Sequence, residues 1–460
     1  MINKVAHTKW GADRRTLKML YKATVRSILD YGSQVYGSAS KQVLSTLEPI
    51  HNEGMRRITG AFRSSPVDSL LVESGELPLY LHRENVTMKS KLNLQHNLSP
   101  IVELFNKRDM YWKDDGREDT APYPTRVNRL FQEMDIETQT PPNIDPLPLW
   151  NIQRAKFCYY LINSGGKDNV PQVLKQIALR HINGKGRHYS IFTDGSKSEN
   201  KVGCAAISTQ ESRAAALPNH ASIFTAELWA IKMALNTISN TDFTQYIIYS
   251  DSKSALDAIR GFQPTNHIIT EIINEIHTIQ ANSNKKISFC WVPSHIGLAG
   301  NEYADKAAKE AANGEPINMV TPPRDHVPAI KRATKEKWQR KWNNVGQDNK
   351  LKQMKTKVEE WKTSMQEERR TEVIMTRLRI GHTNATHSYL MTMPHKPHPT
   401  CEQCGAHLSV RHFMKDCPRY TTIIARYFGN QTLQEILGDD QTTVNKVIAY
   451  LKEIKLHDSI

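Results

Sequence analysis

The sequence predicts a mixed α/β domain in the middle of the chain, flanked on both sides by mainly α-helical regions. Three observations lead to this prediction. Short β-like stretches alternate with helical stripes between residues 187 and 314, acidic residues follow the ends of two of these strands, and proline-rich segments bound the domain. A chain of 460 residues is long enough for two to four domains, each with its own core.

The composition is that of a globular protein. Charged residues make up 23% of the chain and hydrophobic residues 39%, which excludes wholesale disorder. No run approaches the roughly 18 apolar residues needed to cross a bilayer, and the N-terminus lacks the apolar core of a signal peptide. We therefore expect an intracellular protein, nuclear or cytoplasmic, with no membrane partner.

The net charge of +14 indicates a polyanionic partner. Residues 187–314 contain 11 Lys and Arg against 12 Asp and Glu, a net charge of −1. The regions on either side must then carry +15, which is +14 minus −1. The excess positive charge surrounds an acidic centre.

The N-terminal region, residues 1–108, is predicted to be helical. An apolar stripe at three- and four-residue spacing ends near Gly32, and a second helix is expected over residues 41–59. Basic residues accompany both helices: Arg14, Arg15, Lys18, Lys22, Arg56, Arg57 and Arg63. Most of them are expected to lie on a solvated helix face, and a phosphate-contacting surface is the alternative. Residues 109–150, with repeated prolines, are predicted to be a linker.

The central domain is predicted to contain five strands. In chain order we expect strands at 189–193, 202–208 and 213–217, a helix at 224–238, a strand at 246–250, helices at 252–259 and 268–279, a strand at 286–292 and a helix at 301–312. A parallel element after the first helix favours a three-layer α/β domain. A second proline-rich linker is expected over residues 313–328.

The region after the second linker is predicted to be helical and basic over residues 330–380. Trp338, Trp342 and Trp361 lie among its lysines and arginines, which is compatible with base stacking or with inward packing. A helical tail is expected over residues 421–460. The three cysteines outside the C-terminal region, which are Cys158, Cys204 and Cys290, are isolated in apolar surroundings and are expected to be core thiols.

Four acids of the central domain are expected to converge. Asp194 and Asp251 each close a predicted strand, and neighbouring parallel strands bring their carboxyl ends together. Glu227 lies on the apolar side of its helix, where a carboxylate is costly without a charged partner. Asp305 lies on an alanine-rich helix that can approach the sheet closely. Each residue alone also has a structural explanation, as a turn, a helix cap or a half-exposed side chain.

Converging carboxylates cannot all ionise without a cation, because like charges a few Å apart oppose one another. Oxygen ligands favour Mg²⁺ or Mn²⁺. Two such ions about 3.5–4 Å apart can activate water and stabilise the leaving oxygen in phosphodiester hydrolysis. His295 lies in the loop 293–297, from which it could carry a proton to the leaving group.

The motifs that contain these residues resemble ribonuclease H over residues 187–314. They are Thr193-Asp194-Gly195-Ser196, Thr225-Ala226-Glu227-Leu228, Ser250-Asp251-Ser252, Val292-Pro293-Ser294-His295 and Gly300-Asn301-Glu302-Tyr303-Ala304-Asp305. The resemblance implies a ribonuclease H-like mixed five-stranded sheet with helices on both faces and cleavage of the RNA strand of RNA–DNA hybrids. It also implies that the four acids are ligands of two Mg²⁺ or Mn²⁺ ions and that His295 assists turnover.

The sequence departs from this resemblance at one place. Residues 261–264, Gly-Phe-Gln-Pro, join two predicted helices almost directly and leave no room for the basic helical insertion of some members. We therefore expect the basic flanks to hold the hybrid.

The flanks resemble a second family. Trp10-Gly11-Ala12-Asp13, Tyr31-Gly32-Ser33 and Val35-Tyr36-Gly37-Ser38-Ala39 are similar to the segment after the polymerase palm in jockey-like non-LTR retrotransposons. The resemblance implies a thumb-like region at 1–108, followed by the nuclease domain and a terminal Cys/His segment at 395–420. The paired-aspartate polymerase motif does not occur, so we expect no polymerase activity. The missing polymerase part of a longer polyprotein is an expected partner.

The C-terminal cysteines predict a metal site. Cys401, Cys404, His412 and Cys417 give the spacing C-x2-C-x7-H-x4-C, and three sulfurs with one imidazole suit tetrahedral Zn²⁺. His407, His398 or His395 could replace His412, and incidental thiols are the alternative to zinc. For the whole chain, the alternative to a nuclease is a catalytically inactive nucleic-acid-binding remnant of a retrotransposon reading frame.

Overall fold

The computed structural model describes residues 2–97, 99–106, 121–145, 147–148, 150–163, 170–392 and 397–460. The chain divides into two compact units. The sheet unit contains residues 91–106 and 135–329, and the helical unit contains residues 1–90, 107–134 and 330–460. Among the described residues, no helix is both long enough and apolar enough to cross a membrane.

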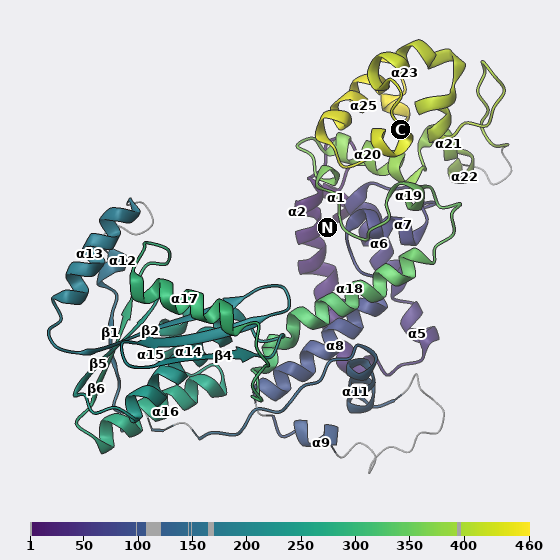
Figure 1. Cartoon of the computed structure of the whole chain (residues 1–460). Coiled ribbons are helices and arrows are strands. Elements are labelled where there is room, and N and C mark those ends of the chain that lie inside the picture. The colour runs from purple at the N-terminus through teal and green to yellow at the C-terminus, as the bar shows by residue number, and fades with distance from the viewer. Residues whose placement is uncertain are drawn as a thin grey trace. The chain divides into compact units, whose positions relative to one another are not determined.

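The sheet unit is built on six strands in the order β1-β6-β5-β2-β3-β4 (Figure 1). The strands are β1 (Lys156–Cys158), β2 (Tyr189–Lys197), β3 (Val202–Ser208), β4 (Ser212–Leu217), β5 (Gln245–Ser250) and β6 (Lys286–Trp291). β1, β6, β5 and β2 run parallel, and β2, β3 and β4 are antiparallel neighbours. The mixed α/β class is confirmed, but the expected five strands are one too few. β1 is only three residues long, too short to produce a periodic pattern.

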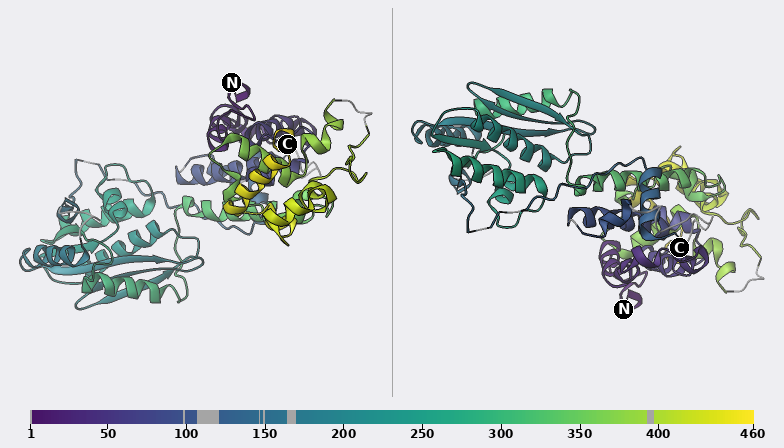
Figure 2. Two further views of the ribbon diagram at one scale, coloured as in Figure 1. Left: turned by 90° about the horizontal axis from the view of Figure 1, so that it is seen from above. Right: turned by 90° about the horizontal axis from the view of Figure 1, so that it is seen from below.

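Helices cover both faces of this sheet (Figures 1 and 2). One face packs on α14 (Ile223–Ser239), α15 (Lys253–Arg260) and α16 (His267–Asn282) in a continuous apolar core. The opposite face is covered by α17 (Ala299–Ala311) and, over β5, β6 and β1, by α12 (Tyr160–Asn163) and α13 (Pro171–Asn183). The predicted three-layer arrangement is therefore present.

Two glycines set how closely α17 approaches the sheet. A Cβ on Gly203 of β3 would lie 2.2 Å from the carbonyl oxygen of Ala308, and a Cβ on Gly300 would lie 2.3 Å from the ring of Phe192. Both distances are far below a van der Waals contact. The absence of these two side chains lets α17 lie directly on β2 and β3.

The segment predicted as a second linker, residues 313–328, is an ordered part of the sheet unit. Pro316 forms a parallel bridge with Ala216 of β4, and the N–H of Ile317 donates to the Ala216 carbonyl at 2.9 Å. Further on, Asp325 Oδ2 accepts hydrogen bonds from Ser222 N at 3.0 Å and Thr225 Oγ1 at 2.6 Å, at the start of α14. The linker prediction is wrong here, because prolines are also tolerated in extended chain along a sheet edge.

The described part of the helical unit is mainly α-helical, with helices of 4 to 18 residues. Within residues 2–133 the structure has α1 (Ile2–Val5), α2 (Arg14–Tyr21), a π-helix (Lys22–Arg26), α3 (Ser27–Asp30), α4 (Ser33–Tyr36), α5 (Lys41–Ser45), α6 (Glu48–Thr59), α7 (Val67–Ser74), α8 (Leu79–His96), α9 (Val102–Asn106) and α11 (Tyr123–Glu133). Of these, α9 and the last residues of α8 belong to the sheet unit. The single helix predicted over 41–59 is two helices, because Pro49 favours a helix start at this point.

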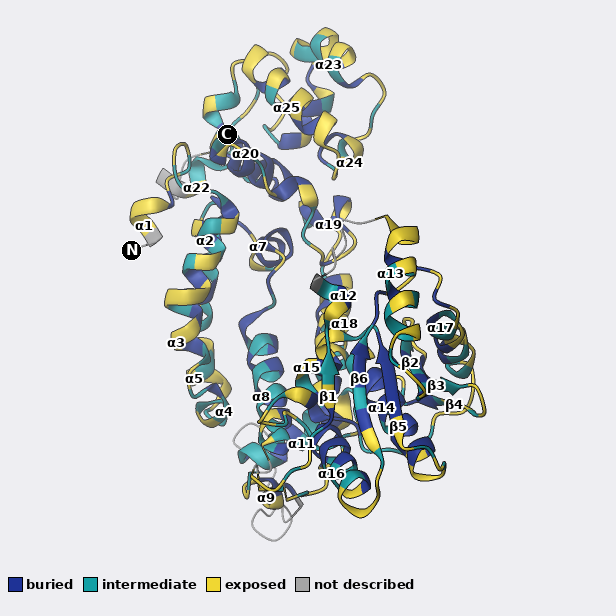
Figure 3. Ribbon diagram, turned by 90° about the vertical axis from the view of Figure 1, so that its left-hand side faces the viewer, coloured by how far each residue is buried: buried dark blue, intermediate teal, exposed yellow. Residues whose placement is uncertain are grey.

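The C-terminal part of the chain adds further helices. They are α18 (Val327–Asn343), α19 (Lys350–Met354), α20 (Arg369–Ile380), α21 (Asn384–His387), α22 (Tyr389–Thr392), α23 (Thr421–Phe428), α24 (Leu433–Ile436) and α25 (Gln441–Glu453). From α18 onward, these helices fold with the N-terminal helices into one compact unit rather than as separate regions. α20 is buried along almost its whole length (Figure 3).

A buried carboxylate ties the parts of the helical unit together. Glu73 of α7 has no solvent exposure and lies 3.5 Å from Arg14, 3.6 Å from Arg379 and 3.8 Å from Lys355. Its Oε1 also accepts a hydrogen bond from Ser364 at 2.8 Å. Arg14 is therefore fully buried, contrary to the expected solvated helix face. A buried charge of this kind is tolerated because it is paired.

The tryptophans of α18 also face inward. Trp338 is 2% exposed and Trp342 is completely buried, and the indole N–H of Trp342 donates to the Lys355 carbonyl at 2.9 Å. Neither side chain is available for base stacking. Of the two explanations for these aromatic residues, inward packing is correct.

The close approach of α17 gives a test. Replacing Gly203 with alanine places a methyl group against the backbone of α17, and such overpacking typically costs about 1–3 kcal/mol. We expect the denaturant midpoint of the sheet unit to fall. Gly261→Ala is the matched control, because its nearest added contact is 3.3 Å and its backbone suits alanine. Equal midpoints for the two variants would contradict the described packing.

Candidate functional site

Three buried or half-buried carboxylates meet at one edge of the parallel strands. Thr193 of β2 pairs with Ser250 of β5, so the residues that follow, Asp194 and Asp251, lie at the same level. β5 ends here as expected, but β2 continues to Lys197 in pairing with β3, so Asp194 lies within its strand and does not close it. Glu227 reaches the same place from the first turns of α14. One oxygen of each acid lies within 4.8 Å of the others. The structure thus brings together three of the four acids singled out in the sequence.

Local structure explains how each acid is held. The Thr193 hydroxyl donates to the Tyr249 carbonyl at 3.2 Å, which ties β2 to the end of β5. Ser252 caps α15, so the chain turns immediately after Asp251. A Cβ on Gly195 would lie 2.8 Å from the backbone nitrogen of Glu227. Glycine at this position therefore lets β2 and α14 approach closely.

The fourth acid lies beside this cluster rather than within it. Asp305 of α17 forms a second group with His295 and Glu302, again with ligand atoms within 4.8 Å. Its carboxylate also pairs with Lys309, one turn further along the helix, at 2.6 Å. Its negative charge nevertheless acts on Asp194, whose pKa it raises. Asp305 therefore borders the cluster while paired with an exposed lysine.

His295 is exposed in the loop between β6 and α17. It has a positive φ of 54°, which is unusual for a residue other than glycine. The loop is held by a hydrogen bond from Gly297 N–H to Glu302 Oε1 at 3.2 Å. His295 is near enough to Asp251 to lower the pKa of that carboxyl. The histidine thus lies at the open side of the carboxylate cluster.

The electrostatics of the cluster are unfavourable in the absence of a cation. Burial, followed by the charges of Asp251 and Asp305, raises the pKa of Asp194 to about 8. Burial, followed by Asp194 and Asp251, raises the pKa of Glu227 to about 9. Burial also raises the pKa of Asp251. At neutral pH, protonation of these carboxyl groups is therefore favoured over a state in which all of them are charged.

The donor set fits a hard divalent cation. Glu227 is 7% exposed, and its Oε2 is buried without a hydrogen-bond partner. An unpartnered buried carboxylate oxygen that faces two other carboxylates is costly unless a cation contacts it. Carboxylate oxygens are the ligands that Mg²⁺ and Mn²⁺ prefer. The residues present are therefore suited to hold such ions.

Two supporting residues were not assigned roles in the sequence. Asn301, 4% exposed at the start of α17, lies close enough to Asp251 for its side chain to lower the pKa of that carboxyl. The indole N–H of Trp291 donates to the backbone carbonyl of Asp251 at 2.9 Å. Asn301 lies inside the motif that contains Asp305, but sequence spacing alone does not show that it faces Asp251.

The four predicted zinc ligands also lie together, in the helical unit. Cys401, Cys404, His412 and Cys417 have ligand atoms within 4.8 Å of one another. The sulfurs of Cys401 and Cys417 are 3.8 Å apart, and Cys404 Sγ is 3.6 Å from His412 Nε2. Zn–S and Zn–N bonds of about 2.3 and 2.0 Å at tetrahedral angles give separations of about 3.8 and 3.5 Å. The group therefore fits zinc.

His398 and His407, two of the three alternative histidines, are not part of this group. His398 and His407 pack against each other with ring centroids 4.9 Å apart, and neither belongs to the cluster of four. His395 lies outside the described residues. Among the described candidates, His412 is the histidine that the fold places with the three cysteines.

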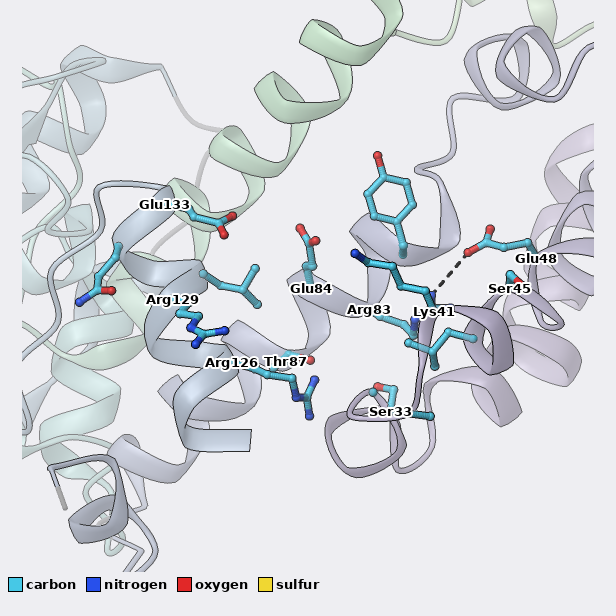
Figure 4. A pocket seen from close by; sticks show the side chains of 16 residues that line it. Ser33, Lys41, Ser45, Glu48, Arg83, Glu84, Thr87, Arg126, Arg129 and Glu133 are labelled. Atoms are coloured by element: carbon cyan, nitrogen blue, oxygen red, sulfur yellow. Dashed lines mark hydrogen bonds and ion pairs between the residues drawn. The ribbon is translucent and has the colours of Figure 1, made fainter. Parts of the chain in front are cut away.

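A cavity of about 690 Å³ in the helical unit is a different kind of feature (Figure 4). Its lining includes the basic side chains Lys41, Arg83, Arg126 and Arg129 and the acidic side chains Glu48, Glu84 and Glu133. Arg126 donates to the carbonyls of Ala121 and Gln34, and Arg83 lies 3.5 Å from Glu48. Because bases and acids nearly balance, this cavity is a poor match for a polyanion.

Residues 186–313 match the family model of RNase H. The segment runs from just before β2 to just beyond α17 and contains all five predicted catalytic residues. The match and the mixed sheet with helices on both faces identify this segment as an RNase H domain. The matched residues do not include β1, α13 or the helical unit.

The strained electrostatics of the cluster give a second test. Acids with raised pKa values destabilise the fold as pH rises above their ordinary values, so Asp194→Asn should stabilise the metal-free protein at pH 8 by about 1 kcal/mol. A domain of this size should gain about 2–4 °C in Tm. Added Mg²⁺ should raise the Tm of the unmodified protein but hardly that of the variant. Asp242→Asn, at an exposed site, is the control, and a lower metal-free Tm for Asp194→Asn would contradict the argument.

Proposed function

We propose that the RNase H domain of this chain is a metal-dependent endonuclease that hydrolyses the RNA strand of RNA–DNA hybrids. One observation carries the proposal. Asp194, Glu227 and Asp251, from three different elements, converge within 4.8 Å in the segment that matches RNase H, with Asp305 beside them. We further propose that the chain belongs to the reverse-transcription machinery of a retrotransposon and lacks the polymerase active site.

In this proposal Asp194, Glu227, Asp251 and Asp305 hold two Mg²⁺ or Mn²⁺ ions. Such ions supply an activated water and charge stabilisation for the leaving oxygen of a phosphodiester. Asn301 and Trp291 act as positioning residues, since they fix the side chain and backbone of Asp251. His295, exposed beside Asp251, carries a proton toward the leaving group and assists turnover.

Asp305 must exchange its partner to take part. Its carboxylate is paired with Lys309 at 2.6 Å, and the lysine side chain is 58% exposed. An exposed pair at this helical spacing contributes only about 0.3–0.5 kcal/mol, so a divalent cation can displace it. Lys309 is then a weak competitor of the ions.

The hybrid must be held without a basic helical insertion. α15 ends at Arg260 and α16 begins at His267, and no helix lies between them. We propose that the basic flanks supply the grip, together with nucleic-acid contact near a zinc-loaded Cys401–Cys417 group. Their excess charge supports this, because phosphate contacts dominate nucleic-acid affinity.

The competing candidate is a catalytically inactive nucleic-acid-binding remnant. It predicts hybrid binding that weakens steeply with salt and no product on long incubation. The buried acids disfavour it. Keeping three carboxylates in apolar surroundings is costly, and a protein that only binds nucleic acid has no need of them.

Hybrid cleavage provides the direct test. The full chain, incubated with a labelled RNA–DNA hybrid and Mg²⁺, should cleave the RNA strand and leave the DNA intact. Asp251→Asn should reduce the rate by at least about 10³-fold, as expected when charge stabilisation in the transition state is lost. Asp257→Asn, on the next helix, should cleave normally. Intact RNA at every metal concentration would favour the inactive remnant.

Lys309 gives a subtler test of the same site. Because its ammonium group competes with a divalent cation for Asp305, Lys309→Ala should lower the Mg²⁺ concentration for half-maximal cleavage by about twofold. Lys306→Ala is the matched control, since Lys306 pairs with Glu310 on the same helix. A higher Mg²⁺ requirement for Lys309→Ala than for the control would show that the lysine instead supports the site.

A further inference from the structure

A second Cys/His group lies in the sheet unit, away from the carboxylate cluster. Cys158 of β1, Cys290 of β6 and His181 of α13 have ligand atoms within 4.8 Å of one another. Cys158 Sγ is 3.2 Å from His181 Nε2. The two cysteines were expected to be isolated core thiols. They do lie in an apolar cluster, but they are not isolated from each other. Cys204, the third, is a buried thiol within the main core of the sheet unit.

The fold explains why residues so far apart in sequence meet. β1 and β6 pair in parallel with Cys158 opposite Cys290, which places the two side chains on the same face of the sheet. That face is covered by α13, and His181 lies in its last turn. The imidazole is stacked on the ring of Tyr160 at 4.8 Å, so its orientation is restricted.

The chemistry of the group is that of a soft metal site. Two thiol sulfurs and one imidazole are preferred ligands of Zn²⁺, and a three-residue set leaves one position for water. The spacing of 3.2 Å between sulfur and nitrogen is close to the roughly 3.5 Å expected for two ligands of one tetrahedral zinc ion.

A cross-link at this position would stabilise β1, which is weakly held by backbone pairing. β1 is an edge strand of three residues, and backbone pairing over so short a length contributes little stability. The segment is further held by Phe157, whose ring stacks on Phe289 at 5.1 Å. A metal bound to β1, β6 and α13 would fix the edge strand and the helix onto the sheet at one point.

We propose that Cys158, Cys290 and His181 form a zinc site that fastens β1 and α13 to the edge of the sheet. Cys158 and His181 lie outside the segment that matches RNase H, whereas Cys290 lies within it, and none of the three is one of the acids proposed to carry the nuclease chemistry. Its role is structural, because the three ligands belong to the elements that the cross-link would join.

The test uses the full chain in a Cys401→Ala, Cys404→Ala background, which removes the C-terminal group as a source of zinc. We expect this protein, purified without chelator, to retain about one zinc per chain by elemental analysis. Adding Cys290→Ala or His181→Ala should reduce the zinc content to a trace. Cys204→Ala, another buried cysteine in the same sheet, should leave it unchanged. His181 is only half-buried, so its variant tests the site even if Cys290→Ala folds poorly.

A spectroscopic readout supports the assignment of ligands. Co²⁺ exchanged into the background protein should give sulfur-to-metal charge-transfer absorption, which His181→Ala should weaken. Three results would overturn the proposal: no zinc in the background protein, zinc that survives both ligand variants, or a disulfide between Cys158 and Cys290. The disulfide would appear as the loss of two alkylatable thiols without reductant.

Discussion

The parallel pairing of β2 with β5 is the constraint on which the site depends. The register that places Thr193 opposite Ser250 puts Asp194 and Asp251 at the same level, where β5 ends and β2 continues against β3 alone. Two carboxylates must then lie close together at a buried edge, whatever the surrounding helices do. Two helices add further acids to this pair of carboxylates. α14 brings a third acid from one face, α17 brings a fourth from the other, and the shared repulsion makes the edge a cation site.

The sequence predicts the parts of this arrangement that follow from local strand and helix patterns, but not the contacts between residues that are distant in sequence. Asp194, Asp251 and Glu227 could be placed because each follows from its own strand or helix, and parallel strands bring their ends together. Asn301 could not be given its contact with Asp251, since spacing does not show which neighbour a side chain meets. β1 and the Cys158–Cys290 pair were missed for a related reason: three residues carry no periodicity, and their partner lies more than 120 positions away in the sequence.

The helical unit shows that net charge is an incomplete guide to binding. Many of its cations neutralise groups inside the unit rather than facing solvent. Arg14, Lys355 and Arg379 surround Glu73, and Arg369 pairs with the buried Glu372. The guanidinium group of Arg377 donates hydrogen bonds to the carbonyls of Gly60 and Ile460. The positive charge available to a polyanion is therefore smaller than the composition suggests and depends on the exposed lysines and arginines.

The contact between Asp325 and the start of α14 bears on where the nuclease module physically ends. α14 carries Glu227, and the start of this helix is held by Asp325, which accepts from Ser222 N and Thr225 Oγ1 and lies twelve residues beyond the end of the RNase H match. Together with the bridge at Pro316, this contact makes residues up to about 326 part of the same folding unit. The RNase H match therefore ends at residue 313, whereas the segment that packs on the sheet and α14 extends to about residue 326. A fragment that ends at residue 313 would keep the Ser222 cap of α14 but lose the Asp325 carboxylate that accepts from Ser222 and Thr225 at the start of this helix.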